Sequence, residues 1–273
     1  MCLAIVAIDA LPDWPLVIVA NRDEFHAREA SEAAPWHDAP DVVAGRDLQA
    51  GGTWLGVTRQ GRAALLTNYR EPGLRNPLAP SRGRLVENYL RGDTTALEYA
   101  QTIDARTQEH NGFSLLLADE AGVWYASNRS DATGSQLPSG IVGLSNALLD
   151  TPWPKLVRSR EAVGRHLATQ PTPDVDALIS IFRDSVPPPD HELPDTGVGV
   201  ERERRLACPF ILDPQYGTRC TSVILRSARG HTLFYEQGYA ADGTPTGRNA
   251  WRINRDTGIT RIPADQALAA LPF

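Results

Sequence analysis

A chain of 273 residues, 42% of them hydrophobic, can bury a substantial core, and we expect one domain over residues 1–273. The net charge of −6 and the scattered arginines give no basic stripe for a phosphate backbone, which excludes nucleic acid as an expected partner. The three cysteines show neither a disulfide framework nor metal-like spacing, so we expect no metal site and a reducing, cytoplasmic compartment.

The chain begins with the pattern of a β-hairpin. Residues 3–8 are apolar and lack a basic segment before them, so they indicate a strand and not a signal peptide. A second apolar run, residues 16–20, follows a loop with two prolines. No run approaches the roughly 18 apolar residues of a membrane-spanning helix, so we expect a soluble protein with no membrane span.

The rest of the chain alternates between strand and helix patterns. Strand patterns first cover residues 53–58, 63–67, 113–118, 123–127 and 140–144. Helical periodicity covers residues 83–91, 95–104, 154–168 and 175–185, with Ser81 as a cap for the first and Pro154 at the first position of the third. After the proline-rich stretch 186–197, strand patterns cover 221–226, 232–236 and 250–253. These last strands are too few to fold alone, so they complete earlier sheets in an α+β fold.

Cys2 is the first candidate for chemistry. We expect Met1 to be removed, which makes Cys2 the first residue and leaves its own α-amine free to act as a base. The amine titrates near ~7.7–8.0 and a free thiol near ~8.5, so the amine can take the thiol proton without a histidine. Of the other two thiols, we interpret Cys220 as buried and inert.

A polar cluster, Asn21-Arg22-Asp23-Glu24, follows directly on the second strand, which brings it close to the N-terminus. A carboxylate there can hold a charged amine, while Arg22 can favour a thiolate or bind a substrate carboxylate or carbonyl. A solvated turn with an Arg–Asp ion pair explains the pattern equally well.

Several short motifs together resemble the NRDE family, which includes the eukaryotic transport and Golgi organisation protein 2. The motifs are Met1-Cys2 and residues 21–24, 51–56, 66–70, 143–146, 149–155, 193–197 and 216–219. They occur in order over most of the chain, which makes the resemblance strong.

The family is similar, more distantly, to cysteine N-terminal-nucleophile (Ntn) hydrolases such as bile salt hydrolases and penicillin V acylases. This resemblance implies a four-layer αββα sandwich of two stacked, mainly antiparallel sheets. It implies Cys2 as the nucleophile, Asp23 as the carboxylate that binds the N-terminal amine, and Asn68 and Asn146 as oxyanion donors. Arg219 matches an arginine that those hydrolases place near the nucleophile.

Arg22 departs from the pattern, because the hydrolases place an arginine three residues before the aspartate and Arg22 is adjacent to Asp23. We include it as a candidate on chemical grounds. Strand ends bring distant segments together, so we expect Cys2, Asp23, Asn146 and Arg219 to converge on one cleft at the edge of the two sheets.

Two functions are compatible with these residues, and both involve a small-molecule ligand or substrate. The first is an N-terminal-cysteine amidohydrolase or acyl-transfer enzyme that acts on a small amide, ester or thioester and requires no cofactor. The second, implied by the eukaryotic members, is a non-catalytic carrier of haem or of lipid and acyl-CoA with a role in trafficking. A carrier needs an apolar cleft, and its candidate lining residues are Trp14, Trp36, Trp54, Tyr69 and Trp153, although aromatic residues are more often core.

Overall fold

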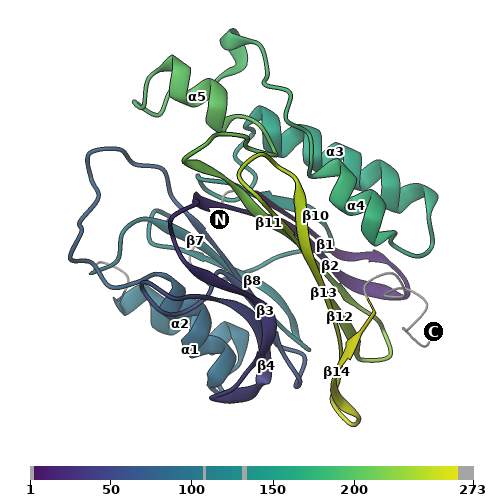
Figure 1. Ribbon diagram of the computed structural model, residues 1–273. Helices are drawn as coiled ribbons and strands as arrows, with labels where there is room; N and C mark the ends of the chain where they lie inside the picture. The colour runs from purple at the N-terminus through teal and green to yellow at the C-terminus, as the bar shows by residue number, and fades with distance from the viewer. Residues whose placement is uncertain (1–2, 107–108, 131–133, 264–273) are drawn as a thin grey trace.

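The structure is a computed structural model that describes residues 3–106, 109–130 and 134–263. Two seven-stranded sheets are stacked on each other, and every described strand pair is antiparallel (Figure 1). The first sheet has the order β10 (Gly140–Leu144), β1 (Leu3–Leu11), β2 (Trp14–Phe25), β11 (Tyr216–Arg226), β12 (His231–Tyr239), β13 (Pro245–Asn254) and β14 (Gly258–Ile262). The second has the order β3 (Ala30–Trp36), β4 (Ala39–Asp47), β5 (Leu55–Thr58), β6 (Ala63–Asn68), β7 (Phe113–Asp119), β8 (Gly122–Ser127) and β9 (Ser135–Gln136).

Helices cover the outer face of each sheet, which confirms the expected αββα order (Figure 1). The first sheet packs against α3 (Pro154–Thr169) and α4 (Val175–Ile181), and the second against α1 (Gly83–Arg91) and α2 (Ala96–Arg106). Two further short elements, the 3-10 helix η2 (Asp190–Glu192) and α5 (Val200–Leu206), lie between α4 and β11 in the chain. Among the described residues, no helix combines the length and the apolar character needed to cross a membrane.

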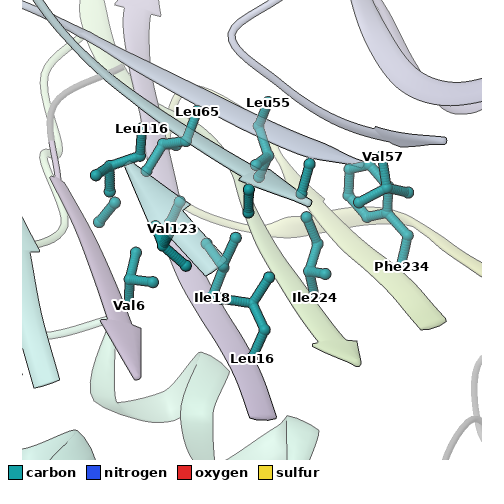
Figure 2. Close-up of a cluster of buried hydrophobic side chains, with 14 of the residues drawn as sticks. Val6, Leu16, Ile18, Leu55, Val57, Leu65, Leu116, Val123, Ile224 and Phe234 are labelled. Atoms are coloured by element: carbon teal, nitrogen blue, oxygen red, sulfur yellow. The ribbon is translucent and has the colours of Figure 1, made fainter. Parts of the chain in front are cut away.

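The central core lies between the two sheets (Figure 2). Alternate residues of β1 and β2, such as Val6 and Ile18, point toward Leu65 and Leu116 of the second sheet. The residues between them, such as Ile5, point the other way and pack against α3 and α4. Because the strands are buried on both faces, they read as continuous apolar runs, and each buried aliphatic side chain contributes roughly 1.5–3 kcal/mol.

The hairpin prediction at the N-terminus is confirmed, but its second strand is longer than expected. Leu11 pairs with Trp14, so the connecting turn is much shorter than the predicted loop. β2 continues through Phe25, which places Asn21 to Glu24 inside the strand and not after it. Pairing with β11 explains this, since Asp23 lies opposite Thr218.

The four predicted helices are present, with one correction to their capping. Pro154 is the first residue of α3, as expected. Ser81 does not cap α1, because its hydroxyl donates instead to the carbonyl oxygen of Gly51 at 3.4 Å. The strands after the proline-rich stretch complete the first sheet, where β11 pairs with β2, as the sequence predicts.

Candidate functional site

Asn21, the first residue of the polar cluster in β2, is a structural anchor. Its side chain is fully buried, and Nδ2 donates to the carbonyl oxygens of Phe182 at 2.9 Å and Pro209 at 2.8 Å. Its Oδ1 accepts from the hydroxyl of Thr221 at 2.6 Å. With these partners the amide has little capacity left for a ligand, and it ties β2 to two loops that are distant in sequence.

A cleft of about 900 Å³ opens beside the end of β2. Its walls come from β2, from the segment between β4 and β5, from the long connection between β6 and α1, and from the region around α5. Three of the predicted site residues, Arg22, Asn68 and Asn146, line it. The cleft has the size of an ordinary small-molecule site.

Arg22 places a buried cation against this cleft. The residue is only 5% exposed, and its guanidinium carbon lies 4.2 Å from the ring centroid of Trp54. Within the described part of the chain the guanidinium of Arg22 forms neither an ion pair nor a hydrogen bond. Buried charges are normally paired. Because the guanidinium of Arg22 has no such partner among the described residues, its N–H groups can donate to an anion in the cleft.

Asn68 and Asn146 are linked to each other. The side-chain Nδ2 of Asn146 donates to the backbone carbonyl of Asn68 at 3.0 Å, and the backbone N–H of Arg70 donates to the carbonyl of Asn146 at 2.8 Å. The amide side chain of Asn68 forms no hydrogen bond with any residue that the structure describes. It can therefore donate to a carbonyl oxygen of a ligand, whereas the amide of Asn146 has one N–H already committed.

A buried ion pair holds this end of the site in place. Arg70 Nη1 donates to Glu203 Oε2 at 2.7 Å, and its guanidinium lies 4.7 Å from the ring centroid of Trp153. Glu203, which is 3% exposed, also accepts from the backbone N–H of Thr196 at 2.9 Å and from its hydroxyl. Four motifs that are far apart in the sequence, at residues 66–70, 143–146, 149–155 and 193–197, meet here.

Asp23 and Arg219 do not line the cleft. Asp23 is 1% exposed and accepts from the hydroxyl of Thr218 at 2.7 Å. Arg219 Nη1 donates to the carbonyl oxygens of Phe25, His26 and Arg28, at 3.0, 3.2 and 3.2 Å, so it holds the turn that follows β2. Burial and, second, the nearby charge of Arg22 lower the pKa of the Arg219 guanidinium.

The predicted nucleophile, Cys2, lies outside the described residues, as does Met1. The first described residue, Leu3, pairs with Asn21 in the hairpin. The described chain therefore starts beside the strand that carries Arg22.

Gly52 shapes one wall of the cleft. Its φ of +78° is in the left-handed region, and a Cβ there would lie 2.3 Å from the backbone carbon of Gly83. The neighbouring Thr53 donates its N–H to the carbonyl of Gly83 at 3.1 Å. A glycine is required at this approach, which brings Trp54 into position under Arg22.

The cleft carries an excess of positive charge. Among the described residues, four carboxylates line it, and each is in an ion pair: Glu24 and Asp47 with Arg28, Glu71 with Arg129, and Asp213 with Arg205. The arginines that line it are Arg22, Arg28, Arg70, Arg75, Arg82, Arg202 and Arg205. In a chain of net charge −6, this local excess favours an anionic ligand.

The aromatic residues expected for a carrier are divided between the cleft and the interior. Trp54 and Tyr69 line the cleft, while Trp14 and Trp36 belong to the hydrophobic cores beneath the helices. The described lining residues include no histidine, cysteine or methionine.

The predicted residues that this site brings together are therefore Arg22, Asn68 and Asn146. The contribution of Glu203 was not visible in the sequence, because the short helix α5 that carries it has no clear periodic pattern. Arg70 could have been found, since it closes the motif at residues 66–70. Within the described residues, no group of three histidine, cysteine, aspartate or glutamate side chains could hold a metal ion.

The solved structures similar to this chain include two hydrolases, both with weak similarity. An N-acylethanolamine-hydrolyzing acid amidase ortholog from Caenorhabditis elegans has a TM-score of 0.49 and 12% identity, over 82% of this chain and 92% of that chain. A mutant of the conjugated bile acid hydrolase from Clostridium perfringens has a TM-score of 0.46 and 10% identity, over 96% of this chain and 97% of that chain.

Similarity in sequence is much stronger. The family model described as Transport and Golgi organisation 2 matches residues 1–241. The Transport and Golgi organization protein 2 homolog of Bos taurus is 37% identical over 262 residues, which cover 87% of this chain and 92% of the relative. The Homo sapiens homolog is 33% identical over 256 residues, with coverage of 87% and 92%. This chain therefore belongs to the Transport and Golgi organisation 2 family.

Proposed function

We propose that this protein is an N-terminal-cysteine hydrolase or acyl-transfer enzyme that cleaves a small amide, ester or thioester, with Cys2 as the nucleophile. The observation that carries the proposal is Arg22, a buried guanidinium with no carboxylate partner in the described chain, at the wall of a cleft. Burying a cation without an opposite charge costs folding free energy, and an anionic group bound in the cleft offsets this cost.

The start of the chain supports this role for Arg22. Leu3, the first described residue, pairs with Asn21, which precedes Arg22 in β2, and on this basis we infer that Arg22 acts on the Cys2 thiol. A cation in this region stabilises a thiolate and lowers the pKa of a thiol. Asp23, buried one residue further along the same strand, is suited to hold the charged amine.

The proposed reaction uses two steps. The α-amine of Cys2 takes the thiol proton, and the sulfur attacks the acyl carbon of the substrate. The tetrahedral intermediate then expels the amine, alcohol or thiol, which takes up the proton from the α-ammonium group. Water hydrolyses the resulting thioester, or a second nucleophile accepts the acyl group.

Asn68 is the better-supported oxyanion donor of the two asparagines. Its amide lines the cleft and forms no hydrogen bond within the described chain, while Asn146 holds the carbonyl of Asn68 and so orients that residue. A preorganised donor of this kind is worth about 2.7–4 kcal/mol of transition-state stabilisation. The positive charge of the cleft favours a substrate that also carries a carboxylate or phosphate group.

The test uses protein in which mass spectrometry has shown that Met1 is absent. The substrates are p-nitroanilides, p-nitrophenyl esters and acyl thioesters, each with and without a terminal carboxylate. We expect a burst of about one equivalent of product with the wild type, no burst with Cys2→Ala, and an unchanged burst with the matched control Cys208→Ala.

Two results would contradict the proposal. The first is a wild type that lacks Met1 yet hydrolyses none of these compounds. The second is a Cys2→Ala variant that retains the activity. If Cys2→Ala still binds the anionic compounds tightly while the wild type turns none over, the carrier function is the correct one.

A further inference from the structure

Exposed hydrophobic side chains gather around the mouth of the cleft. In the described chain, eight large hydrophobic residues are exposed, and six of them are within two positions of a residue that lines the cleft or line it themselves. These six are Phe25, Leu48, Leu74, Leu78, Val200 and Leu212. Single exposed hydrophobic residues are ordinary, but a concentration around one opening marks an interaction surface.

Leu74 and Leu78 are the most exposed of the six, at 72% and 91%. They belong to the long connection between β6 and α1, which projects away from both sheets (Figure 1). Neither leucine lines the cleft, although their sequence neighbours do. Both side chains therefore point outward from the rim of the site.

Hydrogen bonds fix the backbone of the segment that carries the two leucines. Leu74 N–H donates to the carbonyl of Glu71 at 3.2 Å, and Leu78 N–H donates to Asn76 Oδ1 at 2.9 Å. Asn76 is in turn fixed to Asn111 by two reciprocal hydrogen bonds of 2.8 and 2.9 Å. The segment presents its leucines in defined turns that are attached to the body of the protein.

Two positively charged arginines belong to the same part of the cleft wall as these leucines. Arg75 lies between them in the sequence, and Arg202 lies on α5 in another part of the same cleft wall. Both arginines are exposed and have no ion pair within the described residues. The two segments approach each other, since a Cβ on Gly197 would lie 3.6 Å from Pro72.

We propose that this rim, formed by Leu74, Arg75, Leu78, Val200 and Arg202, docks on an anionic lipid membrane, so that the cleft opens toward the lipid. Apolar side chains that insert at the headgroup level, together with arginines that meet lipid phosphates, are the combination that binds proteins to such surfaces. Because the chain carries a net charge of −6, an anionic membrane does not attract the rest of its surface. The rim therefore determines which face of the protein meets the lipid. This inference does not depend on whether the site is catalytic.

The experiment is co-sedimentation of the full chain with vesicles of phosphatidylcholine alone or with phosphatidylserine added. We expect binding to the anionic vesicles, weaker binding to the neutral ones, and a decrease as the salt concentration rises. The double variant Leu74→Ser/Leu78→Ser should lower the partition coefficient by about tenfold or more, because each leucine loses its apolar contact with lipid.

The matched control is Leu97→Ser/Val186→Ser, which alters two other exposed hydrophobic residues, 39% and 63% exposed, away from the cleft. It should bind vesicles like the wild type, and circular dichroism should show that both double variants are folded. Absence of binding to anionic vesicles, or equal binding by Leu74→Ser/Leu78→Ser, overturns the proposal. So does a wild-type oligomer in light scattering that this variant dissociates without lipid, since the rim would then join copies of the chain.

Discussion

Replacing Glu203 by alanine tests whether the ion pair with Arg70 holds the site together. Glu203 is 3% exposed, and the side chain of Arg70 is 11% exposed, so the change leaves a nearly buried guanidinium without its carboxylate. Removing one partner of a buried pair costs about 3–5 kcal/mol. Arg70 keeps its contact with Trp153, which places the expected loss of stability near the lower end, about 3 kcal/mol.

The assay is urea unfolding followed by circular dichroism at neutral pH, with the midpoint and the m-value compared to the wild type. Glu203→Gln retains an acceptor for Thr196 but also leaves the Arg70 guanidinium without a carboxylate, so it should lose nearly as much stability as the alanine variant, about 3 kcal/mol. The neighbouring Glu201, whose side chain is 75% exposed, provides the control, because Glu201→Ala should stay within about 0.5 kcal/mol of the wild type. Equal midpoints for Glu203→Ala and Glu201→Ala would refute the reasoning.

Gly52→Ala should destabilise the protein by well over 1 kcal/mol in a thermal melt, because the alanine meets both the positive φ and the backbone clash. Gly61→Ala is the control, since Gly61 has a φ of +84° with open space around it and should show the cost of backbone strain alone. Burial raises the pKa of Glu236, so its carboxyl group keeps its proton to higher pH in the folded state than in the unfolded state. The free energy of unfolding should therefore fall as the pH rises above 4.5 toward the folded pKa, and Glu236→Gln should remove this pH dependence. Burial also raises the pKa of the thiols of Cys208 and Cys220, so iodoacetamide should label both slowly near neutral pH and faster at alkaline pH; rapid labelling at neutral pH would contradict their burial.

The helices and the apolar strands could be predicted because their patterns are local. The range 83–91 predicted for the first helix agrees with α1 (Gly83–Arg91), where Leu85, Tyr89 and Leu90 form a buried stripe. β3 (Ala30–Trp36) was missed, since it contains alanines, a proline and exposed polar residues that favour a loop. Antiparallel pairing with β4 (Ala39–Asp47) stabilises this strand, although its own residues have low strand propensity.

Three residues that line the cleft, Arg22, Asn68 and Asn146, could be named from the sequence, but the contacts that arrange the site could not. Asn21 follows an apolar run and resembles a turn residue, yet partners far along the chain, at Phe182 and Pro209, keep it inside β2. Arg219 was a candidate for the cleft because of its place in a motif, but the carbonyls of the turn after β2 hold its guanidinium. Such long-range contacts leave no periodic signal in the sequence.

The two contacts expected to meet a ligand belong to different sheets. Arg22 is on β2 of the first sheet and Asn68 ends β6 of the second, so the spacing between them depends on how the two sheets pack. That packing is set by interior side chains such as Ile224 and Phe234 (Figure 2). A misplacement of about 1 Å can cost roughly 100-fold in rate. Conservative substitutions deep in the interior can therefore alter ligand preference while the protein remains folded. Residues that never contact a ligand then become determinants of specificity.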